Sequence, residues 1–221
     1  MSVSPSQLKD EPLHQGLRER LVKELSGKGI ADKNVLNAMG NVKRHIFFNT
    51  AFRHRAYEDI AFPIAAGQTI SQPFTVATQT QLLRIKPGDK ILEIGTGSGY
   101  QTCVLIETGA KVYTIERQKE LYDLTKNLLP QMGYFPKMFY GDGYIGLEAY
   151  APFDKVIVTA GAPYIPEPLK QQLKVGGKLV IPVGEGDTQE MILVDKISET
   201  EYKESKHGMF RFVPMLTQKN K

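Results

Sequence analysis

The sequence contains little cysteine and no tryptophan. Its 221 residues include a single cysteine, Cys103, so no disulfide can form within the chain. Cys103 lies in an apolar stretch and is predicted to be a core residue, not a nucleophile. Because structural disulfides accompany oxidising compartments, the composition fits a reducing one, and we expect a cytoplasmic protein.

Long apolar runs are also missing. No stretch approaches the roughly 20 apolar residues of a membrane helix, and the N-terminus lacks the apolar segment of a secretory signal. We therefore expect no membrane partner. The four histidines, at positions 14, 45, 54 and 207, are scattered without metal-ligand spacing, so no metal site is predicted.

Neither sign of charge dominates the chain. Lysine and arginine number 28 and aspartate and glutamate 24, a net charge of +4. Acids and bases alternate, as in residues 201–206, which is typical of a solvated surface. No basic stripe is interleaved with aromatic residues as on a nucleic-acid surface. We expect no nucleic-acid partner, and we expect a monomer.

Strand and helix patterns alternate through the middle of the chain. Buried-type strands are predicted at 90–94, 111–115, 138–140, 154–158 and 178–181, with helical segments between them and over 166–173. Such alternation predicts an α/β fold of the Rossmann-like type, with a mostly parallel sheet covered on both faces. Further strands at 191–194 and 210–213 would add antiparallel edges.

The chain is predicted to form one domain, residues 1–221. Leucines at every fourth position, Leu17, Leu21 and Leu25, predict a helix ended by glycines, and a second helix is expected near residues 35–39. Residues 61–73 are predicted to be a loop. The N-terminal helical region would span about 7–70, the ligand-binding core about 76–186 and the C-terminal strands about 188–217.

A glycine-rich loop follows the first predicted strand of this core. Residues 93–100 read Glu-Ile-Gly-Thr-Gly-Ser-Gly-Tyr, and glycines there allow close approach of a ligand to the backbone. The spacing is G-x-G-x-G and not the G-x-G-x-x-G of dinucleotide enzymes, which disfavours a nicotinamide dehydrogenase. Glu93 would repel a pyrophosphate and suit a cationic amino-acid ligand. The alternative is a turn without a ligand.

Three acids end successive predicted strands. Glu93 precedes the loop, Glu116 follows it by about 20 residues at the place of a ribose-binding acid, and Asp142 lies between two glycines where it could accept a hydrogen bond from adenine. Singly, Glu116 could be an acid at a helix start and Asp142 a turn residue. Together they favour a crevice at the carboxyl edge of the sheet, suited to S-adenosylmethionine, which carries no phosphate.

The segment after the fourth predicted core strand bears on the methyl acceptor. Residues 159–164 read Thr-Ala-Gly-Ala-Pro-Tyr and offer no amide or carboxylate to hold an exocyclic base amine. Cys103 lies in the wrong element to serve as the thiol that methylation of pyrimidine C5 requires. Methylation of nucleic-acid bases is therefore disfavoured.

From about Leu21 to Thr217 the chain resembles the bacterial protein-L-isoaspartate O-methyltransferases. Residues 67–73, Gly-Gln-Thr-Ile-Ser-Gln-Pro, are the most specific part of this resemblance. The other matching stretches are 92–102, 140–143, 151–154, 175–179, 182–184 and 211–214. The resemblance implies a class I S-adenosylmethionine-dependent methyltransferase fold, and methyl transfer to the free carboxylate of L-isoaspartyl residues in damaged proteins and peptides, with S-adenosylhomocysteine as product.

This resemblance assigns the active-site role to Ser71. The residues then expected to bind cofactor are Gln68, Thr69, Ile70, Glu93, Gly95, Thr96, Gly97, Ser98, Gly99, Gln101, Thr102, Glu116, Arg117, Asp142, Gly143 and Thr159. Those expected to bind substrate are Ala66, Gly67, Ser71, Ala160, Gly161, Arg211, Phe212, Val213 and Pro214.

Other roles stay open at this point. Ser71 could instead cap the helix that starts near Pro73. Another S-adenosylmethionine enzyme acting on a small carboxylate or on peptides, or a binding module without catalysis, could also keep the crevice. The string Gln-Thr-Ile-Ser-Gln-Pro argues against the other enzyme, and the intact acids and glycines argue against the binding module.

Overall fold

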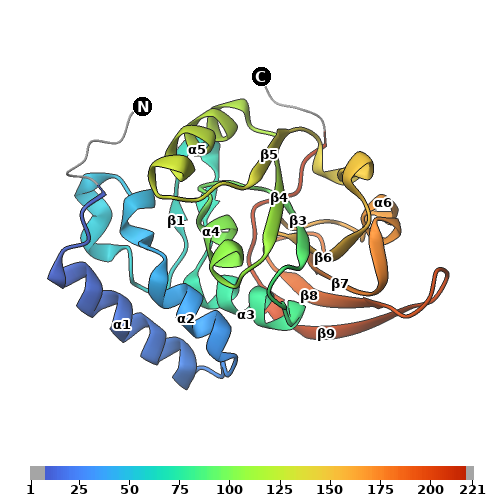
Figure 1. Cartoon of the computed structure of the whole chain (residues 1–221), viewed down its shortest axis with the longest axis horizontal. Helices are drawn as coiled ribbons and strands as arrows, with labels where there is room; N and C mark the ends of the chain where they lie inside the picture. Colours follow the sequence, from blue (N-terminus) through green and yellow to red (C-terminus); the bar gives the residue numbers. More distant parts are fainter. Residues whose placement is uncertain (1–7, 218–221) are drawn as a thin grey trace.

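A seven-stranded sheet forms the centre of the computed structural model, which describes residues 8–217. The strand order is β5-β4-β3-β6-β7-β8-β9 (Figure 1). Strands β5, β4, β3, β6 and β7 run parallel to one another, and the pairs β7–β8 and β8–β9 are antiparallel. The strands are β3 (Lys90–Ile94), β4 (Lys111–Glu116), β5 (Lys137–Tyr140), β6 (Phe153–Val158), β7 (Leu173–Val183), β8 (Gln189–Lys196) and β9 (Tyr202–Phe210).

Helices cover both faces of this sheet. Along β3, Ile91 packs in one apolar cluster while Leu92 and Ile94 pack in another, because successive side chains of a strand point to opposite faces. The α-helices are α1 (Pro12–Gly27), α2 (Lys33–Asn41), α3 (Pro73–Leu83), α4 (Tyr100–Glu107), α5 (Lys119–Gln131) and α6 (Glu167–Gln171). A strand buried on both faces explains the nearly continuous apolar runs of β3 and β6.

The N-terminal region lies beside the sheet (Figure 1) and contributes to a third apolar cluster. Leu21 and Leu25 of α1 are buried with Met39 of α2, and this cluster includes Tyr100 and Cys103 of α4. The region continues as short elements, namely η2 (Arg44–Phe47), η3 (Thr50–Arg55), β1 (Phe62–Pro63), η4 (Ala65–Gly67) and β2 (Thr69–Ile70). The helix expected from the leucine period is confirmed, and the cysteine is a buried core residue as predicted.

Most predicted core strands are confirmed, and three predictions are corrected. The loop expected at 61–73 contains the antiparallel pair β1–β2 and the start of α3. The helix expected to reach Leu173 ends at Gln171, and Leu173 opens β7. The last strand is β9, not 210–213. Lysines and glutamates on the exposed edge strand hid its pattern, and such charges protect a sheet edge from pairing with other chains.

The connection order creates a switch point beside β3. The chain passes from β3 outward to β4 and β5, then returns to β6 on the other side of β3. In open α/β sheets, ligands bind outside the carboxyl ends of strands at such a point. Short 3-10 turns, η5 (Gly143–Ile145) and η6 (Glu148–Tyr150), follow β5. Within the described residues, no helix is both long and apolar enough to span a membrane.

Candidate active site

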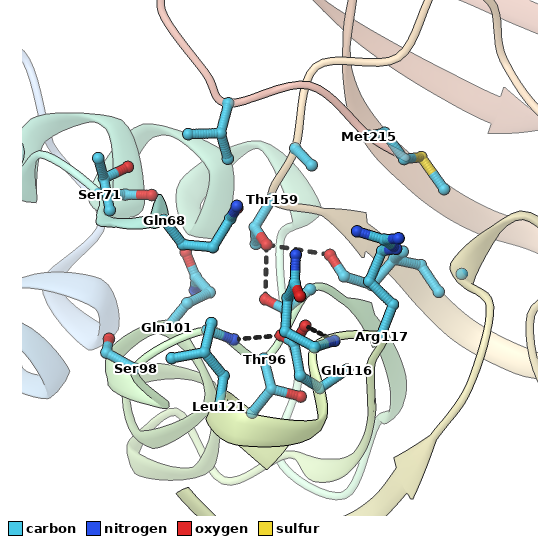
Figure 2. A pocket seen from close by; sticks show the side chains of 18 of the residues that line it. Gln68, Ser71, Thr96, Ser98, Gln101, Glu116, Arg117, Leu121, Thr159 and Met215 are labelled. Carbon is cyan, nitrogen blue, oxygen red and sulfur yellow. Dashed lines mark hydrogen bonds between the residues drawn. The ribbon is translucent and has the colours of Figure 1, made fainter. Parts of the chain in front are cut away.

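A cavity lies at the carboxyl ends of β3, β4 and β6, where the switch point predicts a ligand (Figure 2). It has a volume of about 90 Å³ and is partly open to solvent. In Figure 2, Ser71 lies at one side and Arg117 and Met215 at the opposite side. The predicted site residues that line it are Gln68, Thr69, Ile70, Ser71, Gly95, Thr96, Gly97, Ser98, Gln101, Glu116, Arg117, Gly143, Thr159, Ala160, Val213 and Pro214.

The glycine loop has the left-handed backbone that its sequence predicts. Gly95 has a φ of 93°, and a Cβ there would lie 2.6 Å from Thr159 Oγ1. That hydroxyl is held in place because it donates to the carbonyls of Ile94 and Gly95 at 3.0 and 2.7 Å. At Gly97, by contrast, a Cβ would meet nothing within 4 Å and would point into open space. The loop therefore leaves its backbone accessible at Gly97.

Glu116 connects the end of β4 to this loop. Its Oε2 accepts a hydrogen bond from Gly97 N at 2.8 Å, and its Oε1 accepts one from Gln118 N at 2.8 Å. The carboxylate also lines the cavity, and burial raises its pKa. Because an ionised carboxylate has about four lone-pair sites, it retains capacity to accept hydroxyl donors from a ligand.

Glu93 lies behind the loop and does not line the cavity. It is fully buried, its Oε2 accepts from Thr102 Oγ1 at 2.5 Å, and its Oε1 has no partner. Burial raises its pKa to about 8. The expectation that Glu93 and Thr102 contact a ligand directly therefore finds no support in this geometry, because both side chains support the loop from inside.

Several other expected site residues lie next to the cavity without lining it. Gly161 donates to Val213 O at 2.8 Å and accepts from Met215 N at 2.7 Å, which fixes the 213–215 segment over the cavity. Asp142 accepts from Tyr144 N at 2.9 Å and starts η5. The remaining expected residues outside the lining are Ala66, Gly67, Gly99, Arg211 and Phe212.

Ser71 lines the cavity, and the capping alternative for it is wrong. The first turn of α3 receives its cap from Asp59, whose Oδ1 accepts from Phe74 N at 2.7 Å. Gln72 occupies the N-cap position and makes no side-chain cap bond. Among residues 8–217 the Ser71 hydroxyl has no hydrogen-bond partner. It is therefore available to a ligand in the cavity.

Some lining residues were missed by sequence reasoning. Ile94 and Ile115 are the last apolar residues of β3 and of the inner part of β4, and Leu121 faces the cavity from α5. Strand-end position was a usable signal for the isoleucines. No sequence signal indicated that Leu121 lines the cavity, because its position in the helical period predicts core packing. The other missed lining residues are Val76, Tyr100, Gln118, Met215 and Leu216.

Two histidines that are distant in sequence come together in the structure. His14 and His45 stack with ring centroids 3.8 Å apart, and Asp10 lies near them. The description of all four histidines as scattered is therefore corrected. Both nitrogens of His45 are already engaged, with Tyr57 Oη at 2.8 Å and Lys9 O at 3.0 Å. Arg18 binds both oxygens of Asp10, so the cluster has few free ligand atoms.

The sheet order, the glycine loop and the carboxylate at the end of β4 define a Rossmann-like methyltransferase of the S-adenosylmethionine-dependent class. The family model described as "Protein-L-isoaspartate(D-aspartate) O-methyltransferase" matches residues 16–220, and the chain belongs to this family. The resemblance noted from the sequence is thereby confirmed.

Curated relatives agree along nearly the whole chain. The protein-L-isoaspartate O-methyltransferase of Flavobacterium psychrophilum is 58% identical over 214 residues, covering 96% of this chain and 100% of the relative. The enzyme of the same name from Cytophaga hutchinsonii is 53% identical, with 95% of each chain covered.

Solved structures share the fold. A Plasmodium falciparum protein described by the same enzyme name, in complex with S-adenosyl-L-homocysteine, gives a TM-score of 0.77 at 27% identity and covers 90% of this chain and 98% of that one. Another protein-L-isoaspartate O-methyltransferase gives 0.79 at 26% identity; the match covers 89% of this chain and 65% of that longer one.

Proposed function

We propose that this protein transfers a methyl group from S-adenosylmethionine to the free carboxylate of L-isoaspartyl residues in damaged proteins and peptides. The observation that carries the proposal is the position of Ser71. Its unpartnered hydroxyl lies in the same cavity as the glycine loop and Glu116. A family match over residues 16–220 supports the same reaction.

The residues present fit S-adenosylmethionine. Gln101 Oε1 is buried without a partner, although the side chain lines the cavity and its Nε2 donates to Thr80 Oγ1 at 3.0 Å. A buried acceptor of this kind calls for a donor from a ligand. The open space at the Gly97 Cβ position provides room beside the loop.

In this proposal, different residues of the site contact different parts of the cofactor. Glu116 would accept the ribose hydroxyls, and Gly143 with Asp142 would border the adenine. Gln68 and Thr69 of the β1–β2 segment, with Thr159 after β6, would surround the amino-acid end. Each assignment follows from position in the cavity, except that of Asp142, which lies next to Gly143 outside the lining.

The reaction requires the protein to align the carboxylate with the methyl group, and it does not require a strong base. When bound, the cofactor supplies a methyl group made electrophilic by its sulfonium. An isoaspartyl carboxylate is already ionised at neutral pH. Ser71 would donate a hydrogen bond to one carboxylate oxygen and direct the other toward the methyl group, while Val213 and Pro214 exclude water. Positioning of this kind is worth several kcal/mol, up to about 7–11 in the best cases.

The methyl ester formed in this reaction also explains how an isoaspartyl residue would be repaired. The methyl ester loses methanol when the following backbone nitrogen attacks it, which forms a succinimide without help from the enzyme. Water opens this ring at either carbonyl, and one of the two openings restores a normal aspartyl residue. The proposal includes a single domain, a monomer in a cytoplasmic compartment, and damaged proteins, not nucleic acid, as partners.

The decisive assay compares two peptides that differ only in the aspartyl linkage. With labelled S-adenosylmethionine, we expect methyl transfer to the L-isoaspartyl peptide and none above background to its normal aspartyl form. Equal methylation of both peptides would contradict the repair function. Calorimetry with S-adenosylhomocysteine and NADH tests the cofactor separately, and tight binding of NADH alone would contradict the assignment.

A further inference from the structure

A second cavity lies beside the cofactor cavity, between the N-terminal region and helix α5. It has a volume of about 600 Å³. Phe47, Phe48 and Phe62 come from the N-terminal side, and Leu124 and Leu128 come from α5. Helix α5 and the β1 segment lie next to each other in Figure 1. The walls are therefore largely apolar and come from segments far apart in sequence.

One charged side chain lines this cavity. Arg53 has no carboxylate within 4 Å in the described part of the chain, and its Nε is buried without a hydrogen-bond partner. Desolvation lowers its pKa and the charge of Glu11 opposes that shift, so the guanidinium stays charged at neutral pH. A buried donor without an acceptor is costly, so its persistence calls for an explanation.

Each of the other polar side chains of the wall makes one hydrogen bond within the protein. Asn49 Oδ1 accepts from Ala51 N at 3.2 Å, Ser98 Oγ accepts from Tyr100 N at 3.3 Å, and Thr125 Oγ1 donates to Gly97 O at 2.8 Å. Arg53 is thus the lining side chain whose hydrogen-bonding capacity is used least among the described residues. A guanidinium pairs with anionic hydrogen-bond acceptors, and the geometry of a carboxylate matches it.

We propose that this cavity binds a small carboxylic acid with an apolar body, whose carboxylate pairs with Arg53 and whose body lies among the phenylalanines and leucines. A peptide fits less well, because its backbone amides would find few partners along these walls. The site is separate from the methyl-transfer function proposed above and does not depend on it.

Ligand binding there would be coupled to the cofactor. Ile70, Ser98 and Leu121 line both cavities. A ligand that shifts these shared side chains changes cofactor affinity, and the cofactor changes ligand affinity by the same factor. The second cavity therefore gives an apolar acid a way to adjust cofactor binding without occupying the cofactor's place.

Decanoate and its uncharged analogue decanol test this proposal. Equilibrium dialysis on the full chain, with S-adenosylhomocysteine present to fill the cofactor cavity, should show one decanoate site and roughly 10-fold weaker binding of decanol. Arg53→Gln should weaken decanoate binding roughly 10-fold and leave decanol unchanged. The matched control is Arg55→Gln on the same 3-10 helix, where Arg55 pairs with Glu58 and does not line the cavity.

A cavity-filling variant gives an independent readout. Leu124→Trp should reduce binding of both decanoate and decanol, while melting temperatures confirm that each variant folds. Equal affinity of the wild type for the two probes, or an unchanged decanoate affinity in Arg53→Gln, would overturn the proposal. The proposal would also be overturned if rising concentrations of S-adenosylhomocysteine weakened decanoate binding without limit, because such competition would place decanoate in the cofactor cavity.

Discussion

The two sides of the cavity are built in different ways. The glycine loop, residues 93–102, is held from behind by buried polar contacts, including Glu93 with Thr102 and Thr159 with two loop carbonyls. The hairpin segment, residues 62–71, consists of two-residue strands joined by a 3-10 turn. Its bonds are mainly local, such as Ile64 N to Gln68 O at 2.8 Å.

This difference separates stability from turnover. Changes in the loop should alter folding and cofactor binding together, because its backbone and its supports form one packed unit. Changes in the hairpin segment should alter the reaction with little effect on folding, because Ser71 contributes no cap and no internal hydrogen bond among the described residues.

The largest effect is expected from Gly95→Ala. The new methyl group would take a left-handed φ and overlap Thr159 Oγ1, so the free energy of unfolding should fall by about 2–5 kcal/mol. Urea denaturation measures it. Gly97→Ala is the control, since it has the same backbone sign but open space, and it should cost only about 1–2 kcal/mol.

A double variant identifies the cause of that loss. Thr159→Ala removes the hydroxyl that the new methyl group meets, so Gly95→Ala with Thr159→Ala should be less destabilised than the two single losses added together. Simple additivity would show that the overlap is not the source, and that backbone strain alone accounts for the loss.

Glu93 should make stability depend on pH in an unusual direction. Its pKa is about 8 in the folded protein against an ordinary 4.5. Its contribution is therefore complete below pH 4.5 and is lost as the pH rises through 8, because the unfolded chain releases this proton first. The slope is about −1.4 kcal/mol per pH unit within that window.

Glu93→Gln supplies the comparison for this prediction. The amide is neutral at every pH and its oxygen still accepts from Thr102, so the slope due to residue 93 should vanish. Unfolding free energies at pH 5.5, 6 and 7 should diverge between wild type and variant by about 1.4 kcal/mol per unit. Parallel curves would show that Glu93 is ionised in the folded protein.

The same contrast explains what the sequence could predict. Strand β3 matches its predicted bounds, because a buried strand followed by glycines is a local pattern. The cofactor side of the cavity follows from that pattern. Strand β9 was misplaced because its charges reflect an exposed edge, and the β1–β2 pair was missed because two-residue strands have no measurable period.

Contacts between distant segments were the other limit. Glu93 was expected to face the ligand, and only the packing of Thr102 on α4 against β3 shows that it faces inward. The cap of α3 comes from Asp59, 15 residues before the amide of Phe74 that it accepts from. The family resemblance identified Ser71 as a candidate, and the structure shows that its hydroxyl is available to a ligand.

The smallest expected effect on folding, and the sharpest test of the contrast, is Ser71→Ala. The change removes one hydroxyl and adds no bulk. Because Asp59 caps α3, the free energy of unfolding should change by less than about 0.5 kcal/mol. Turnover on an L-isoaspartyl peptide should fall on the order of 10-fold or more, since the carboxylate loses the donor that orients it.

Single-turnover methyl transfer and melting temperature, measured on the same preparation, test whether Ser71 acts in the reaction and not in folding. Affinity for S-adenosylhomocysteine should change much less than turnover, and Ser71→Thr, which keeps a hydroxyl, should retain more activity than Ser71→Ala. Ser98→Ala gives a comparison, because it removes a lining hydroxyl that accepts from Tyr100 N and lies on the expected cofactor side. Full activity of Ser71→Ala with a lowered melting temperature would make Ser71 structural, and the carboxylate would then have to be oriented by the Val213–Pro214 side of the cavity.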